Sequence, residues 1–129
     1  MDVSDLFPSP STAFLFLIYT AAHTENQRSR VARKRGLQGS NELFGTFADV
    51  SGFFSIIFSL VFFIAYWYDT GISSAGALLI LSIVIAIIYH FISASIFGDS
   101  FIVWMAGTIA IWPMMFALIP RVTWFGVFG

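Results

Sequence analysis

The sequence predicts an all-α integral membrane protein, a small bundle of four transmembrane helices in a single domain that covers residues 1–129. Hydrophobic residues make up 58% of the chain and charged residues only 10%, whereas an ordinary soluble domain carries about 25% charged residues. The stretch 72–97 contains no Asp, Glu, Lys or Arg. A helix over this stretch would be about 39 Å long, enough to cross a hydrocarbon layer of about 30 Å with some tilt.

The first helix is expected over about 10–35. Ser9 and Pro10 suit its N-terminus, because serine caps a helix and proline is tolerated in the first turn. The apolar part ends near His23, which is short of the about 20 residues of a typical span. Basic side chains that follow can reach the headgroups and extend the span. The alternative is a helix that lies in the interface, which would leave three spans.

The second helix is expected over about 50–68. Glycines at 36 and 39 break the first helix, and the segment 41–48 is expected to lie along the membrane surface. Asp49 is then expected to cap the second helix. The alternatives are a hydrogen bond from Ser51 and an ion pair with the basic cluster that precedes it. The run Tyr66 to Tyr68 is typical of an aromatic belt at a membrane interface, and a tight turn follows it.

The third and fourth helices are expected over 72–97 and about 101–119. Gly98 suits the end of the third helix, and Ser100 suits the N-cap of the fourth. Pro113 removes one backbone donor near the middle of the fourth helix, which predicts a kink there.

Small residues recur every four positions on the second and third helices, as expected where membrane helices pack closely. We expect these two rows to pack against each other. The first row comprises Ser51, Ser55 and Ser59, and the second comprises Ser82, Ala86, Ala94 and Gly98, with His90 in the same register.

Basic residues cluster between the first two helices, so the positive-inside rule places the basic loop 24–48 in the cytoplasm or its equivalent, with both termini on the opposite side. Beside a membrane helix such a cluster binds anionic headgroups rather than nucleic acid. The cluster comprises Arg28, Arg30, Arg33, Lys34 and Arg35.

His90 is a titratable residue inside an otherwise apolar span, and such residues mark functional sites often enough to be examined first. His23 is expected at a comparable depth on the first helix. Two imidazoles at one depth would suit a haem or a chlorophyll-type cofactor. The alternatives are a neutral histidine hydrogen-bonded to a serine or a carbonyl, and a proton or ion path. The chain has no cysteine, which excludes thiol chemistry.

No arrangement of nucleophile and base is recognisable, so the sequence favours a non-catalytic accessory or structural subunit of a membrane complex, with other subunits or copies of itself as partners. A second hypothesis is a cofactor-binding subunit that uses His90 and His23. A third is a small homo-oligomeric channel or transporter, with Pro113 and Ser55 on its path.

The layout of four spans, a basic first loop and about 130 residues resembles the MAPEG membrane family of glutathione-linked trimers. In that family an Arg, Asn and Glu set at the entrance of the second helix binds glutathione. The corresponding region here reads GTFADVSGFF and supplies only Asp49. The resemblance therefore implies a membrane enzyme of this layout but transfers no site residue.

Overall fold

The computed structural model describes residues 6–34, 42–98 and 100–127, and the described residues form no strand. The all-helical class is therefore confirmed. The elements in chain order are α2 (Pro10–Lys34), α3 (Glu42–Thr70), α4 (Ile72–Phe97), α5 (Phe101–Leu118) and the short 3₁₀ helix η1 (Ile119–Arg121).

Three segments are long and apolar enough to cross a membrane: Leu43–Thr70, Ile72–Phe97 and Ile102–Arg121. The segment Pro10–Lys34 is less apolar and is not among them. By length and composition, the sequence therefore specifies three membrane-type helices and one helix of mixed character.

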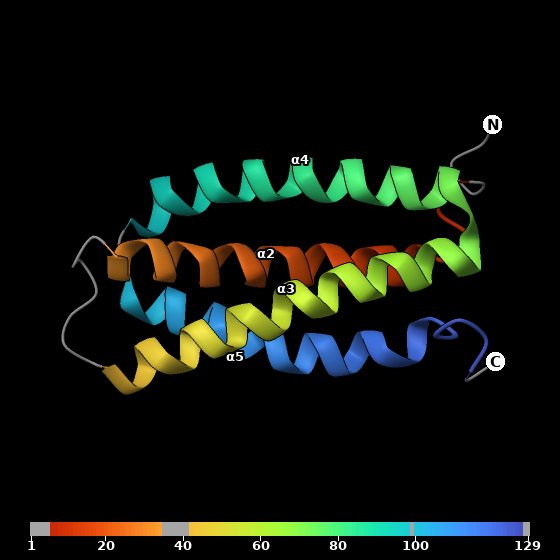
Figure 1. Ribbon diagram of the computed structural model, residues 1–129. Helices are drawn as coiled ribbons and strands as arrows, with labels where there is room; N and C mark the ends of the chain where they lie inside the picture. Colours follow the sequence, from red (N-terminus) through yellow and green to blue (C-terminus); the bar gives the residue numbers. More distant parts are fainter. Residues whose placement is uncertain (1–5, 35–41, 99, 128–129) are drawn as a thin grey trace.

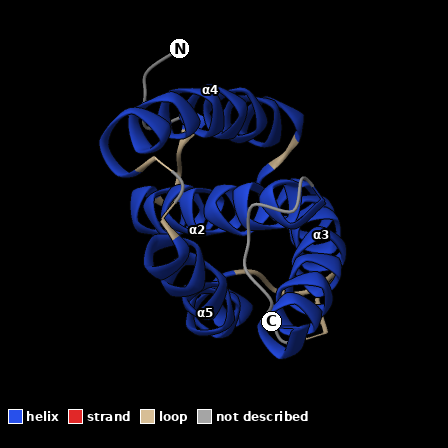
Figure 2. Cartoon of the chain, turned by 90° about the vertical axis from the view of Figure 1, so that its left-hand side faces the viewer, coloured by secondary structure: helices blue, strands red, loops and turns tan. Residues whose placement is uncertain are grey.

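The helix of mixed character lies in the middle of the bundle. Figure 2 shows α2 between α4 on one side and α3 and α5 on the other, and α2 contacts all three. Successive helices run in opposite directions, so that the start of α2, the turn at Gly71 and the end of η1 lie at one end of the bundle (Figure 1). The end of α2 and the turn at Gly98 lie at the other end.

The helix ends follow the local sequence. Helix α2 begins at Pro10, as predicted. Gly71 and Gly98 have φ values of 96° and 57°, a region that glycine enters at little cost, and they flank α4. Ser100 caps α5, because its side chain accepts a hydrogen bond from the backbone N–H of Val103 at 3.4 Å. Pro113 lies inside α5, as predicted.

The start of the second helix differs from the prediction. Helix α3 begins at Glu42, so the segment 42–48 continues the helix instead of lying separately along the surface. Asp49 consequently does not cap the helix, because it lies two turns inside it and forms an ion pair with Arg30 at 3.4 Å. Residues 24–34 are helical as well, which shortens the expected loop. The predicted helix break at 36 and 39 lies outside the described residues.

Candidate functional site: the polar interior around α2

Buried polar side chains concentrate on α2. Thr12, Tyr19, Glu25, Asn26 and Ser29 are each no more than 2% exposed. In contrast, the outer faces of α3, α4 and α5 carry large exposed apolar side chains. Burying a polar group without a partner is costly, so the neighbours of α2 must supply hydrogen bonds. The polar interior is therefore the part of the bundle to examine for a site.

Two glycines allow close approach to α2. A Cβ atom at Gly52 of α3 would lie 2.6 Å from Oδ1 of Asn26, and one at Gly107 of α5 would overlap the side chain of Glu25. Any larger residue at these positions would require a neighbouring side chain or a helix to shift. These glycines bring α3 and α5 close to α2 around Glu25 and Asn26, in the manner of small residues at membrane helix interfaces.

An ionic cluster joins α2 to α4. Nη1 of Arg28 lies 3.0 Å and 3.1 Å from the two carboxylate oxygens of Glu25, and it donates to Oγ of Ser93 at 2.5 Å. Nη2 of Arg28 donates to the carbonyl oxygen of Gly98 at 2.5 Å. Ser93 donates to Glu25, and the Tyr89 side chain lies close to Glu25 as well. Arg28 and Glu25 thus neutralise each other and have further hydrogen-bond partners. Charged side chains are buried at an acceptable cost only when they are paired in this way.

Asn26 joins α2 to two other helices. Its Nδ2 donates to the carbonyl oxygen of Ala48 in α3 at 3.0 Å and to Oγ1 of Thr108 in α5 at 3.2 Å. Its Oδ1 is buried without a hydrogen-bond partner among the described residues. One amide therefore fixes the position of α2 relative to α3 and α5.

A row of hydrogen bonds joins α2 to α3. Nδ1 of His23 lies 2.7 Å from Oγ of Ser55, which lies 2.5 Å from the Tyr19 hydroxyl. The hydroxyl of Ser59 donates to the Tyr19 hydroxyl at 3.0 Å, and Tyr19 donates to the Ser55 carbonyl at 2.7 Å. We call His23, Ser55, Tyr19 and Ser59 the polar row. Ser55 is fully buried, so a substrate has no access to it as a nucleophile.

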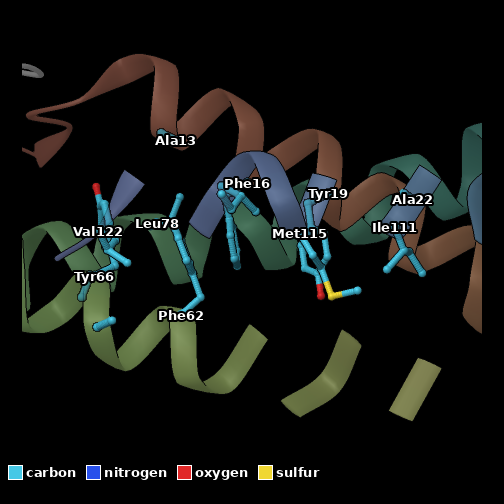
Figure 3. Packing of buried hydrophobic residues seen from close by; sticks show 13 residues of the cluster. Ala13, Phe16, Tyr19, Ala22, Phe62, Tyr66, Leu78, Ile111, Met115 and Val122 are labelled. Atoms are coloured by element: carbon cyan, nitrogen blue, oxygen red, sulfur yellow. The ribbon is translucent and has the colours of Figure 1, made fainter. Parts of the chain in front are cut away.

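Aromatic side chains close the polar row at the end nearer Gly71. The rings of Phe16 and Phe62 stack with centroids 5.3 Å apart, and Phe58 stacks on Phe62 at 5.8 Å. Figure 3 shows Phe16, Phe62 and Tyr66 in this region, with Tyr19 on the side nearer Ala22. We call Phe16, Phe58 and Phe62 the aromatic plug. The plug belongs to the main hydrophobic cluster of the bundle.

The predicted serines of the second helix lie at interfaces, but not with the expected partner. Ser55 and Ser59 contact α2, and Ser51 accepts a hydrogen bond from Nε1 of Trp112 in α5 at 3.0 Å. The expected packing of this row against α4 is therefore wrong. Because α2 lies between α3 and α4, the hydroxyl of Tyr19 and the imidazole of His23 form the hydrogen bonds with Ser55 and Ser59.

The row of small residues on α4 turns away from the bundle along its length. Ser82 is buried and Ala86 is half-buried, whereas His90, Ala94 and Gly98 are exposed. Positions four apart drift around a helix by about 40° per step, which accounts for this change of face. The inward positions near the end of α4 are Tyr89 and Ser93, which contact Glu25.

The basic cluster is divided between the interior and the end of the bundle. Arg28 is buried against Glu25, in contrast to the expected contact with headgroups. Arg30 is partly exposed beside Asp49. The side chains of Arg33 and Lys34, and the whole of Arg35, lie outside the described residues. Binding of anionic lipid by this cluster stays a prediction.

The two histidines lie in different surroundings. His23 lies between Ser55 and Gln27, whose Nε2 is 3.4 Å from Nε2 of His23. His90 is exposed on α4, with its ring against Phe91. The hydrogen bond to a serine that the sequence suggested for His90 is formed by His23 instead. A haem or chlorophyll-type cofactor on both residues stays a prediction, and it would require both rings to turn toward one site.

An apolar groove of about 370 Å³ lies between α3 and α5 on the side opposite the ionic cluster. It is lined by Phe54, Phe58, Trp112, Phe116 and neighbouring apolar side chains. Since the lining offers almost no polar surface, the groove suits an acyl chain and not a hydrated ion. The predicted channel with Ser55 on its path gains no support from this groove.

Family models, curated proteins and solved structures give no match to this chain. The candidate site therefore rests on the geometry alone. The sequence interpretation did not single out Glu25, Asn26, Gly52 or Gly107. Two signals in the sequence were available for these residues. One was the isolated glycines within apolar helices, and the other was the set of polar residues at 12, 19 and 26, which lie seven apart on one helix face.

Proposed function

We propose that this chain is a non-catalytic subunit of a membrane protein complex, in which the outward face of α4 contacts helices of other subunits. The four helices form the membrane-embedded unit, and α2 crosses with the other three because their apolar surfaces shield its polar groups. The buried polar side chains join the helices of the bundle to one another.

The observation that carries this proposal is the exposed surface of α4. Of the three apolar helices, α4 has the smallest fraction of its membrane-type stretch buried inside the bundle. Its outward face combines large apolar residues, such as Ile87 and Phe91, with the small residue Ala94 and the polar residue His90. An imidazole that faces lipid is unfavourable, whereas one that faces another helix can form a hydrogen bond.

The experiment that tests this proposal is photocrosslinking in the native membrane. A photoreactive phenylalanine analogue replaces Phe91, which is 65% exposed on α4, and in a matched control it replaces Phe116, which is 67% exposed on α5. We expect a protein adduct of one defined mass from position 91 and lipid adducts from position 116.

A bulky residue sharpens the test. Ala94→Trp should remove the protein adduct, because Ala94 lies one turn from Phe91 on the outward face. Ile80→Trp, near the other end of the same exposed face, should leave the adduct unchanged. Lipid adducts alone at position 91, or an adduct that withstands Ala94→Trp, would contradict the proposed contact.

A further inference from the structure

The polar row consists of groups that exchange protons. An imidazole carries a proton on either ring nitrogen, and each hydroxyl both donates and accepts. The links from His23 to Ser55, from Ser55 to Tyr19 and from Tyr19 to Ser59 measure 2.7 Å, 2.5 Å and 3.0 Å. All three distances lie within hydrogen-bond range, so the row is continuous.

The hydrogens of the row can be arranged in two directions. In one arrangement the Tyr19 hydrogen turns from the Ser55 carbonyl to the Ser55 hydroxyl, and Ser55 donates to Nδ1 of His23. In the other His23 donates to Ser55, and Ser55 donates to Tyr19; either atom of each pair can be the donor. A proton that arrives at Nε2 of His23 releases the proton on Nδ1 to Ser55. Ser55 passes its own proton to Tyr19, Tyr19 passes its own to Ser59, and the proton of Ser59 leaves the row on the side of the plug. Each group gains one proton and loses one, so charge moves without a change in the heavy-atom bonds.

One end of the row approaches water. Gln27 contacts Nε2 of His23, and the next turn of α2 carries Arg30. The side chains of Arg30 and Asp49 are 25% and 49% exposed, at the end of the bundle where α2 finishes. Protons from solution therefore have a short route to His23 past partly exposed polar groups.

The other end of the row stops at the aromatic plug. Phe62 is fully buried, and it stacks on both Phe16 and Phe58. Tyr66 lies beyond, with its ring centroid 6.3 Å from that of Phe62 and with its hydroxyl unpartnered among the described residues. Apolar rings offer no donor or acceptor that could continue the row.

We propose that the polar row is a proton path that opens toward Arg30 and Asp49 and is closed by the aromatic plug at Phe62. This activity goes beyond the proposed role as a subunit, and it needs no partner chain for its test. Withdrawal of the plug connects Tyr19 and Ser59 to the Tyr66 end of the bundle and makes the protein conduct protons.

The test measures proton flux into liposomes that contain the purified full chain and a pH-sensitive dye, driven by a potassium diffusion potential. Wild-type protein should give a flux close to that of empty liposomes. Phe62→Ala should raise the flux several-fold. Ser55→Ala or Tyr19→Phe, added to Phe62→Ala, should return the flux to the wild-type level, because each removes one link of the row.

The control is Trp104→Ala, which removes a buried aromatic side chain from the first turn of α5 and should leave the flux unchanged. If Phe62→Ala does not fold, Phe16→Ala removes the stacking partner from α2 instead. The proposal is overturned if the plug variants conduct no more than Trp104→Ala or conduct equally well without Ser55. An equal flux of sodium ions would also overturn it, because that would indicate an aqueous pore.

Discussion

The two halves of α2 are buried by different chemistry. The half from 23 to 30 is fixed by an ion pair, an amide and close contacts at two glycines. The half from 13 to 22 packs mainly by means of aromatic rings and alanines, and Tyr19 supplies its hydrogen bonds to α3. Polar contacts are directional and specify one position of the helix. In a membrane, apolar contacts between helices compete with contacts to lipid of similar polarity. Apolar packing therefore stabilises the bundle mainly through the close fit of its side chains.

A helix of mixed character is accommodated here among apolar helices because its neighbours supply partners for its polar groups. Three apolar helices surround α2, and each supplies polar atoms to it: Ser93 from α4, Ser55 from α3 and Thr108 from α5. We therefore expect substitutions in the polar half to be costlier than those in the aromatic half.

The largest effect is expected for Glu25→Ala. It leaves the Arg28 guanidinium buried without its opposite charge, which costs about 3–5 kcal/mol of unfolding free energy. This loss of unfolding free energy is measured by unfolding the protein in mixed micelles of mild detergent and dodecyl sulfate. The matched control is Asp49→Ala, which breaks a partly exposed ion pair and should cost less than about 1 kcal/mol. Equal losses for the two variants would contradict the contrast between buried and exposed charge.

A smaller loss is expected for Gly107→Ala. The added methyl group overlaps the Glu25 side chain and separates α5 from α2, at a cost of about 1–3 kcal/mol. The same substitution at Gly76 meets no atom within 4 Å and should stabilise α4 by about 0.5–1 kcal/mol, since alanine favours a helix interior. Opposite signs in the same unfolding assay are the expected result, and a neutral Gly107→Ala would show that the close approach is not required.

Phe62 of α3 packs against the aromatic half of α2. Phe62→Leu should cost less than about 1.5 kcal/mol, because apolar replacements that keep most of the volume are accepted. Asn26→Leu is the matched change in the polar half. It should cost more, because it removes the donor to Ala48 and Thr108. A greater loss from Phe62→Leu than from Asn26→Leu would reverse the comparison between the halves.

The smallest effect is expected for Asp69→Ala outside both halves. The Asp69 carboxylate accepts hydrogen bonds from the backbone N–H of Thr123 at 2.8 Å and from its hydroxyl at 2.5 Å, at an exposed site. Loss of these bonds should cost about 0.5–1.5 kcal/mol. It should also increase proteolysis of the chain after η1, measured by limited digestion, with Asp69→Asn as a milder variant. Unchanged digestion would show that this contact does not hold the C-terminal segment.

The sequence by itself determined the class and most helix ends. Absence of charge over 72–97 requires an apolar environment, and Pro10, Gly71, Gly98 and Ser100 act through local backbone geometry. The start of α3 was missed because the segment 42–48 mixes polar and apolar residues, and continuity with the helix that follows decides its structure.

Only the tertiary structure decided where the polar residues of α2 lie. The sequence shows Glu25 and Arg28 three positions apart, but the same spacing occurs in exposed helices. Which helix faces which is settled by the summed packing of the whole bundle, including the space left at Gly52 and Gly107. For the same reason Ser55 and Ser59 of α3 bind α2 and not α4, and Ser51 binds α5. A repeat of small residues marks an interface but carries no information about the partner.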